Sequence, residues 1–361
     1  MLRVGRRAVV ELAIVGLALV AAFVPMAAGG VERWFSTGMY PALQHAITPV
    51  SNLLPVALFD VLAGAAFAIA FGALCHAARL AWRTRRALPA LRVVGHLAAG
   101  AALMYVMFLL VWGLNYRRVP MFERLLVESG SPAPEAVVQL GLDAASALNT
   151  LHDRAHRSGW RREPWEDADL RRAFADVQRE LSEAPPAVPG RLKHTLLGPY
   201  FRWAGIDGMI NPFGLEALAN PDLLPFERPF VAAHEWAHLA GYADEAEASF
   251  VGWLACIRAD SEAQYSGWLA LSWQVNSEVS QSARVRLARA LDAGPRRDVE
   301  AIAARLRRGQ WPWLRNAGWR VYDRYLKANR VEQGVASYGG VVTLILRARF
   351  GEGWRPVRRR Q

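Results

Sequence analysis

The stretch Pro229–Ala255 holds the residues whose types and spacing point most directly to a chemistry. His234 and His238 lie four residues apart, so on a helix both imidazoles project from the same face, with Glu235 beside them. This is the HExxH pattern of zinc hydrolases. Two neutral imidazoles can hold a zinc ion at about 2.0–2.1 Å, which leaves room for a third protein ligand and a water. The ion lowers the pKa of that water to roughly 7, and Glu235 would accept its proton and pass it to the leaving group.

The third ligand is expected among the acids that follow the motif, where Asp244, Glu245 and Glu247 compete. If a second helix runs over residues 244–257, Glu245 lies on a strip of small residues that lets another helix come close, and we favour it. Asp244 stays open because HExxHxxGxxD also matches the metzincin spacing. Glu247 is about 200° round the helix from Glu245, so it is expected to point away and either support a ligand or face solvent.

The elements that must position these groups can also be predicted. Pro229 suits a first helical position, and Gly241 is expected to end the helix because glycine readily adopts the left-handed conformation. Cys256 lies on the strip of small residues, on the order of 16 Å from Glu245, which is too far to bind the same ion. We expect it to be a buried thiol. Cys75, the other cysteine, lies in an apolar segment, so no disulfide is predicted.

Four blocks of the chain resemble one family. They are WGLNYRRVP at Trp112–Pro120, INPFGLEALAN at Ile210–Asn220, PFVAAHEWAHLAGYADEAEASF at Pro229–Phe250 and VYDRYLKANRVEQGVASYGGVV at Val321–Val342. The family is an uncharacterised bacterial group of membrane-anchored HExxH proteins, catalogued as a domain of unknown function and regarded as zinc peptidases. The resemblance runs from the third apolar segment nearly to the C-terminus.

The resemblance implies a gluzincin-like zinc site in which Glu245 is the third ligand. Two positions depart from the family pattern. Ser249 stands where the family usually has asparagine, which would alter a hydrogen bond behind a ligand. Gly214 and Leu215 replace a usual threonine–glycine pair, which would alter a loop on the substrate side. Neither departure removes an expected ligand.

The composition points to a membrane protein. Hydrophobic residues make up 53% of the 361 residues, and the mean hydropathy is slightly positive, which is high for a fully soluble chain. The net charge is +11, from 43 basic and 32 acidic residues. The basic residues are dispersed rather than gathered in a stripe, so nucleic-acid binding is not expected.

Three segments are apolar enough to cross a bilayer of about 30 Å, namely residues 8–28, 54–75 and 93–114. The first also fits a signal peptide, but we expect a retained span because two more follow. Asp60 lies near one end of the second span and is expected to be a solvated carboxylate at the interface.

The distribution of arginines predicts an orientation. Three arginines precede the first span and five separate the second from the third, whereas residues 29–53 contain one. The positive-inside rule therefore places the N-terminus in the cytoplasm, at the bacterial inner membrane. Arg117 and Arg118, just after the third span, argue mildly for the opposite orientation. The expected domains are a membrane domain, 1–115, and an extracytoplasmic metal domain, 116–361.

The sequence predicts that the metal domain is mostly helical. Helices are expected at 135–157, 167–181, 261–275 and 299–308, with an exposed linker around Gly294 and a core helix at 335–346. His152 and His156 in HDRAH are again four residues apart, but no glutamate follows the first histidine. A solvated helix end is therefore expected there rather than a second metal site.

Residues Arg191–Asn220 are the least regular part of the metal domain, rich in glycine, proline and aromatic residues. In zinc peptidases an extended edge segment beside the metal helix lets a peptide pair by its backbone, and this stretch is the natural candidate. An ordinary loop with a short hairpin is nearly as good an interpretation.

The sequence therefore predicts a mainly α-helical fold, with three N-terminal transmembrane helices followed by a zincin-like domain of little β-structure. We expect a zinc peptidase whose partners are the lipid bilayer and a peptide or protein substrate. Tyr338 is a further candidate, for stabilising the oxyanion. An intramembrane metalloprotease is disfavoured because acids follow the histidines so closely. A non-catalytic protein with structural zinc is the other alternative, and a fourth protein ligand would distinguish it.

Overall fold

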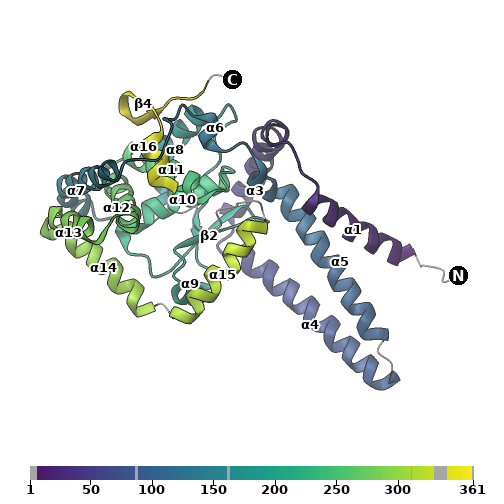
Figure 1. Ribbon diagram of the computed structural model, residues 1–361. Helices are drawn as coiled ribbons and strands as arrows, with labels where there is room; N and C mark the ends of the chain where they lie inside the picture. The colour runs from purple at the N-terminus through teal and green to yellow at the C-terminus, as the bar shows by residue number, and fades with distance from the viewer. Residues whose placement is uncertain (1–5, 86–87, 161–162, 310, 329–339, 360–361) are drawn as a thin grey trace.

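The computed structural model describes residues 6–85, 88–160, 163–309, 311–328 and 340–359. Across these ranges helices dominate and strands are few and short, as predicted for a mainly α-helical protein. Figure 1 shows an arm of three long helices, α1, α4 and α5, that projects from a larger helical body. The HExxH stretch lies in the body.

The arm consists of α1 (Arg6–Phe23), α4 (Leu58–Thr84) and α5 (Leu88–Val111), and α5 packs against the other two. The helices α4 and α5 are long and apolar enough to cross a membrane. Helix α1 passes the same test only as part of a pair with the helical segment 28–53, which is bent by 115°. The arm thus offers two candidate spans, or three if the bent pair is one span.

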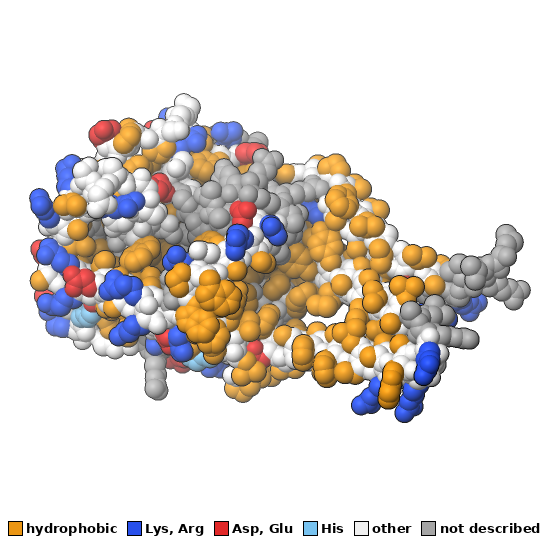
Figure 2. Space-filling model, turned by 60° about the horizontal axis from the view of Figure 1, so that its bottom comes forward, with side chains coloured by type: hydrophobic (Ala, Val, Ile, Leu, Met, Phe, Trp, Pro, Cys, Tyr) orange, Lys and Arg blue, Asp and Glu red, His pale blue; other side chains and the backbone are white. Residues whose placement is uncertain are grey.

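The candidate spans begin at residues 58 and 90 rather than at the expected 54 and 93. Helix α4 starts late because Pro55 favours an extended conformation at the residue before it, and Leu54 is extended. Figure 2 shows hydrophobic side chains along the arm, with Lys and Arg side chains gathered at its far end. That surface suits a helical hairpin inserted into lipid.

The segment between the first and second expected spans is helical and packs on the body. It contains α2 (Ala28–Val31), the π-helix η1 (Glu32–Met39) and α3 (Tyr40–Leu53). Side chains on the buried face of α3 are polar. Gln44 Nε2 donates to the Val188 carbonyl at 2.7 Å, and Thr48 Oγ1 donates to the Leu215 carbonyl at 2.9 Å. Because polar residues form the contact between α3 and the body, the sequence contains no apolar periodicity that would predict it.

The core of the body is a group of helices around α11. These are α7 (Pro134–Arg157), α8 (Ala168–Leu181), α10 (Arg228–Leu239), α11 (Glu245–Ile257), α12 (Ser261–Glu278) and α16 (Gly340–Arg347). In α11, every residue except the last is buried. Helix α11 therefore has no solvent-facing side, which is why its sequence is apolar or small almost all round.

The remaining helices surround this core. They are α6 (Met121–Arg124), α9 (Gly198–Ala204), α13 (Gln281–Ala290), α14 (Ala293–Gly309), α15 (Pro312–Ala328) and the short 3₁₀ helices η2 (Gly113–Arg117), η3 (Pro164–Glu166), η4 (Pro225–Glu227) and η6 (Glu352–Trp354). The four expected helices from 135 to 308 are present with shifted ends. The prediction of an exposed linker around Gly294 is wrong, because this residue lies in the first turn of α14. Residues 335–339 of the expected core helix lie outside the described ranges, and the rest of it is α16.

Two small sheets complete the described part of the body. One contains β1 (Leu192–Lys193), β2 (Gly208–Asn211) and β3 (Glu216–Ala219) in the order β1-β3-β2, with β1 parallel and β2 antiparallel to β3. The other pairs β4 (Phe350–Gly351) with β5 (Arg355–Pro356). Strands β2 and β3 lie against α10. Strand β2 is an edge strand within residues 191–220, and its antiparallel pairing with β3 is also the short hairpin that the sequence left open.

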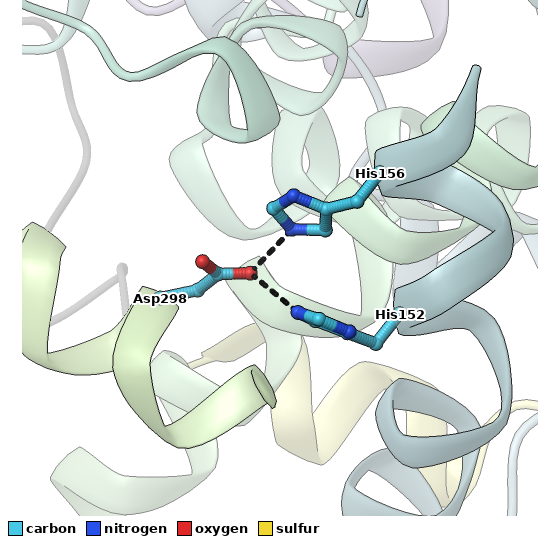
Figure 3. A group of neighbouring side chains, drawn as sticks. All are labelled: His152, His156 and Asp298. Atoms are coloured by element: carbon cyan, nitrogen blue, oxygen red, sulfur yellow. Dashed lines mark hydrogen bonds and ion pairs between the residues drawn. The ribbon is translucent and has the colours of Figure 1, made fainter. Parts of the chain in front are cut away.

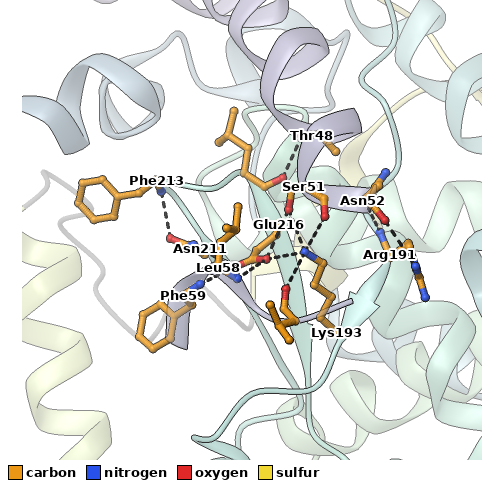
Figure 4. A network of polar contacts seen from close by, with 12 residues as sticks. Thr48, Ser51, Asn52, Leu58, Phe59, Arg191, Lys193, Asn211, Phe213 and Glu216 are labelled. Carbon is orange, nitrogen blue, oxygen red and sulfur yellow. Dashed lines mark hydrogen bonds and ion pairs between the residues drawn. The ribbon is translucent and has the colours of Figure 1, made fainter. Parts of the chain in front are cut away.

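A buried carboxylate joins this sheet to the start of the arm (Figure 4). Glu216 accepts hydrogen bonds from the backbone amides of Leu58 and Phe59 at 3.0 and 2.7 Å, and from Lys193 Nζ at 2.9 Å. Burial alone would raise the pKa of Glu216, but the hydrogen bonds from Lys193 and Asn211 outweigh it, so the pKa is lowered. The anion satisfies free amides at the N-terminus of α4 and so holds the arm against β3.

Asp60, in the same first turn of α4, makes a similar connection. Its carboxylate accepts from Thr195 Oγ1 at 2.5 Å and from the Leu196 amide at 2.9 Å. Asp60 therefore lies at the end of a candidate span, as expected, but it bonds to the body rather than to solvent alone.

Candidate metal centre

The two helices that carry the candidate ligands cross at very short range. A Cβ atom placed on Gly252 of α11 would lie only 3.0 Å from the backbone nitrogen of His234 on α10. A larger residue at this position would push the helices apart. The strip of small residues on α11 thus allows the close approach that a carboxylate on one helix needs to reach histidines on the other.

The crossing brings three ligand atoms into a triangle. His234 Nε2 lies 3.1 Å from His238 Nε2, and Glu245 Oε2 lies 3.3 Å from the first nitrogen and 3.4 Å from the second. His234 and His238 come from successive turns of α10, and Glu245 comes from the first turn of α11. Among the three acids weighed from the sequence, Glu245 is the one that joins the histidines.

In both histidines the Nδ1 atom, which faces away from the triangle, lies near an oxygen atom of another residue. His238 Nδ1 lies 2.8 Å from the Tyr242 carbonyl and so carries the hydrogen, which it donates. Gly241, at φ 85°, ends α10 and turns the chain so that this carbonyl lies beside the ring. His234 Nδ1 lies 3.3 Å from Ser249 Oγ. In this tautomer the Nε2 lone pairs of His234 and His238 both face the triangle.

The dimensions of the triangle fit a zinc ion. In a tetrahedral site with bonds of about 2.0–2.1 Å, neighbouring donor atoms are about 3.3 Å apart. The three measured separations of 3.1, 3.3 and 3.4 Å bracket that value. Two imidazole nitrogens and one carboxylate oxygen are also a donor set typical of zinc. The residues present therefore suit this ion.

The electrostatics of the triangle favour a cation. Burial would raise the pKa of Glu245, but the charge and hydrogen bonds of the two histidines hold it well below its usual value. Burial would lower the pKa of His238, but the Glu245 carboxylate outweighs burial and raises the pKa to about 9. At His234 burial prevails and the pKa is lowered. The field of Glu245 that favours a proton on His238 would equally favour a metal ion.

Glu235 lies beside the triangle in a dry environment. Its residue is 3% exposed, and its Oε2 atom has no hydrogen-bond partner among the described residues. Burial raises the pKa of Glu235 to about 8. A Cβ atom on Gly208 would overlap the Glu235 carboxylate, so β2 passes directly over this group. A buried carboxyl with a raised pKa next to an edge strand is suited to exchanging protons with a bound molecule.

The other two acids have separate tasks. The Asp244 side chain caps α11 by accepting from the amides of Ala246 and Glu247 at 2.9 and 3.1 Å. Glu247 points away from the triangle, as its place on the helix predicts, but it is buried rather than at the surface. Its carboxylate accepts from the Met121 amide at 2.6 Å and lies 3.6 Å from Arg124 Nη2.

Side chains from α3 and from the linker that follows α5 bind the end of α10, a feature that the sequence did not predict. Trp112 Nε1 donates to the His238 carbonyl at 2.9 Å, and Tyr40 Oη donates to the Leu239 carbonyl at 2.6 Å. Arg118 Nη1 donates to the Gly241 carbonyl at 2.9 Å. The Leu239 and Gly241 carbonyls thus receive side-chain donors, and the His238 carbonyl, which also accepts from the Gly241 amide at 3.0 Å, receives a second one. Arg118 adds a positive charge at the helix end. Trp112 and Arg118 both belong to the WGLNYRRVP block, which was the available signal.

The arginines that complicated the orientation have structural partners. Arg118 is buried and binds both carboxylate oxygens of Glu32, at 2.7 and 2.9 Å. Arg117 donates to the Ala21 carbonyl at 2.8 Å. The charge of Arg118 is therefore paired with an acid inside the fold, whereas Arg117 donates to neutral groups near the end of α1. Tyr338, named above as a further candidate, lies outside the described residues.

Comparison with known proteins adds one match. A family model described as "Protein of unknown function (DUF3810)" matches residues 35–346, which include the arm helices α4 and α5, both helices of the triangle and α16. No curated protein and no solved structure matches the chain.

Proposed function

Starting from the fact that the chain belongs to this family of proteins of unknown function, DUF3810, we propose that it is a membrane-anchored, zinc-dependent peptidase. The observation that carries the proposal is the triangle of His234, His238 and Glu245 ligand atoms, 3.1–3.4 Å apart, with the buried Glu235 carboxylate beside it. Its active site is gluzincin-like, with both histidines and the general base on one helix and the third ligand on the next.

Each residue has one role in the proposed reaction. His234, His238 and Glu245 hold the zinc ion, which when bound supplies a water of lowered pKa. Glu235 accepts a proton during the attack on the scissile carbonyl and gives it to the leaving amine nitrogen. Tyr242 and Ser249 keep the two imidazoles in the tautomer that ligation requires.

Strand β2 is the proposed substrate platform. It pairs with β3 on one side, and among the described residues no strand pairs with its other side. An extended peptide can add to such an edge by backbone hydrogen bonds. Because Gly208 of β2 lies against Glu235, a peptide on that edge would bring its backbone next to the general base.

Two alternatives have less support. An intramembrane protease would carry its ligands on a spanning helix, but α10 and α11 are not among the helices long and apolar enough to span. A structural zinc site would have four protein ligands. Within the described ranges no fourth ligand group joins the triangle.

The membrane placement belongs to the same proposal. The arm anchors the protein in the bacterial inner membrane, with the N-terminus in the cytoplasm and the metal domain outside it. The basic side chains at the far end of the arm support this orientation under the positive-inside rule. Arg118 counts less against it than its position in the sequence suggests, because its charge is paired with Glu32.

The test uses the full chain in detergent with two substitutions. We expect Glu235→Gln to keep its zinc and to lose cleavage of an unstructured protein such as casein, because only the proton acceptor changes. Glu135→Gln, an exposed glutamate at the start of α7, is the matched control and should keep both. A native chain without zinc, or cleavage that survives Glu235→Gln, contradicts the mechanism.

A further inference from the structure

We propose that the protein holds a second divalent metal ion, bound by His152 and His156 of α7 and by Asp298 of α14. Figure 3 shows the three side chains converging from the two helices. In Figure 1, α7 and the start of α14 lie at the side of the body away from the arm. None of the three residues contributes to the triangle on α10 and α11.

The geometry differs from the expected solvated helix end. Helix α14 packs on α7, so that Asp298 Oδ2 lies 2.8 Å from His156 Nε2 and 3.8 Å from His152 Nε2. The ring centroids of the two histidines are 4.3 Å apart. The His152 side chain is 15% exposed and the Asp298 side chain 11%. One ligand atom from each residue lies within 4.8 Å of the other two.

Two neighbours orient the ligands as the partners of metal ligands do. His152 Nδ1 lies 2.9 Å from Asp153 Oδ1, which places the hydrogen on Nδ1 and turns the Nε2 lone pair toward Asp298. Tyr265 Oη donates to Asp298 Oδ2 at 2.6 Å and fixes the carboxylate. Hydrogen bonds of this kind from outside the ligand set are typical of metal centres. A Cβ atom on Gly294 would overlap the His152 ring, so the backbone of α14 also holds that ring in place.

A cation would relieve one repulsion within the cluster. His156 Nε2 and Asp298 Oδ2, 2.8 Å apart, already share a hydrogen, which would have to move to His156 Nδ1 for this nitrogen to bind an ion. In the tautomer set by Asp153, His152 Nε2 and Asp298 Oδ2 are both acceptors, and they face each other at 3.8 Å. Two facing acceptors repel unless a positive charge lies between them. The separations of 2.8 and 3.8 Å are on either side of the roughly 3.3 Å expected for neighbouring zinc ligands, so small shifts would complete the site.

The donor set indicates which ion would bind. Two imidazole nitrogens and one carboxylate oxygen favour zinc or a similar transition metal over calcium or magnesium, which prefer oxygen ligands. His156 is one-third exposed in its side chain, which leaves a path for the ion and a position for water. The ion would tie α14 to the end of α7, across 142 residues of sequence.

The experiment counts zinc in the full chain, purified in detergent, reloaded with zinc and freed of excess. We expect two ions in the native chain. His152→Ala and Asp298→Asn should each retain one, and His238→Ala should retain one from the other site. The matched control is His194→Ala, which removes an exposed histidine outside both clusters and should retain two.

A second measurement covers the case in which a ligand variant fails to fold. Tyr265→Phe keeps the ring and all three ligands, so we expect it to fold and to bind the second zinc about 10–100-fold more weakly in a competition titration. Zinc content in His152→Ala equal to that of the native chain overturns the proposal. So does a native chain whose zinc is wholly lost in His238→Ala. Loss of the triangle zinc alone would leave one ion that depends on His152, and this would contradict the proposed peptidase but not the second site.

Discussion

The indole nitrogen of Trp112 donates a hydrogen bond of 2.9 Å to the backbone carbonyl of His238. Trp112 directly follows α5, a candidate membrane span, and His238 carries a candidate zinc ligand. The end of the apolar arm is therefore fixed to the last turn of the helix that carries the histidines.

Replacing Trp112 by phenylalanine tests this connection. We expect Trp112→Phe to lower the free energy of unfolding by about 0.5–1.5 kcal/mol, because the His238 carbonyl loses one of its two hydrogen bonds and keeps the one from the Gly241 amide, while most of the ring packing remains. Zinc affinity should fall as well, since the last turn of α10 loosens. Thermal unfolding and a zinc competition titration measure the two effects. Trp273→Phe, at a partly exposed position of α12, is the control and should change neither.

Ser249 offers a graded test of the His234 ligand. Its Oγ lies 3.3 Å from His234 Nδ1. Ser249→Ala removes the acceptor, so zinc affinity should fall about 10–100-fold. Ser249→Asn places there the residue that the family usually has, and its amide oxygen can accept the same hydrogen, so affinity should stay near the native value. Equal affinity of the alanine variant and the native chain would mean that Ser249 does not orient the imidazole.

Gly208 separates catalysis from metal binding. A Cβ atom there would overlap the Glu235 carboxylate, so Gly208→Ala must displace either β2 or the general base. Zinc content should stay native because no ligand is touched, whereas the cleavage rate should fall at least about 10-fold, since small displacements of catalytic groups are costly. Gly351→Ala in β4 is the control, because its added methyl would only reach ordinary van der Waals contact with the Arg355 carbonyl oxygen at 4.0 Å. Native cleavage in Gly208→Ala would rule out the close approach of β2 to Glu235.

Glu216 predicts a pH effect. Its pKa is lowered in the folded protein, so its contribution to stability is complete above the unfolded value of about 4.5 and is lost as the pH falls further. The native chain should therefore lose stability below about pH 4.5, and Glu216→Gln should lose less over the same range. At pH 7 the variant should be less stable by about 3–5 kcal/mol, because Lys193 keeps a buried charge without its partner. Thermal unfolding between pH 7 and pH 4 measures both.

The double variant Lys193→Met with Glu216→Gln provides the control for that result. Removing both charges should restore much of the stability lost in Glu216→Gln at pH 7, because no unpaired charge remains. If the double variant is as unstable as the single one, the amides of Leu58 and Phe59 rather than Lys193 are the important partners of Glu216.

Local residue patterns were enough to predict the secondary structure around the site. The HExxH spacing, Pro229 and Gly241 define a helix that is present as α10, ended by a glycine at φ 85°. Apolar runs predict the candidate spans α4 and α5. These predictions succeed because side chains within one helix repeat with its period, so a short window of sequence contains the whole signal.

The relations between distant segments were decided only by the tertiary structure. The sequence left three acids as candidates for the third ligand, and the crossing of α10 and α11 brings Glu245 to the histidines while Asp244 caps its own helix. Three contacts were not predicted. They are the packing of the polar face of α3 on the body, the hydrogen bond from Trp112 to the end of α10, and the contact of Asp298 with the histidines of HDRAH. Each of these three contacts joins residues that are more than 100 positions apart in the sequence. The distance and direction between such residues are set by the way separate helices pack, and no local periodicity encodes that packing.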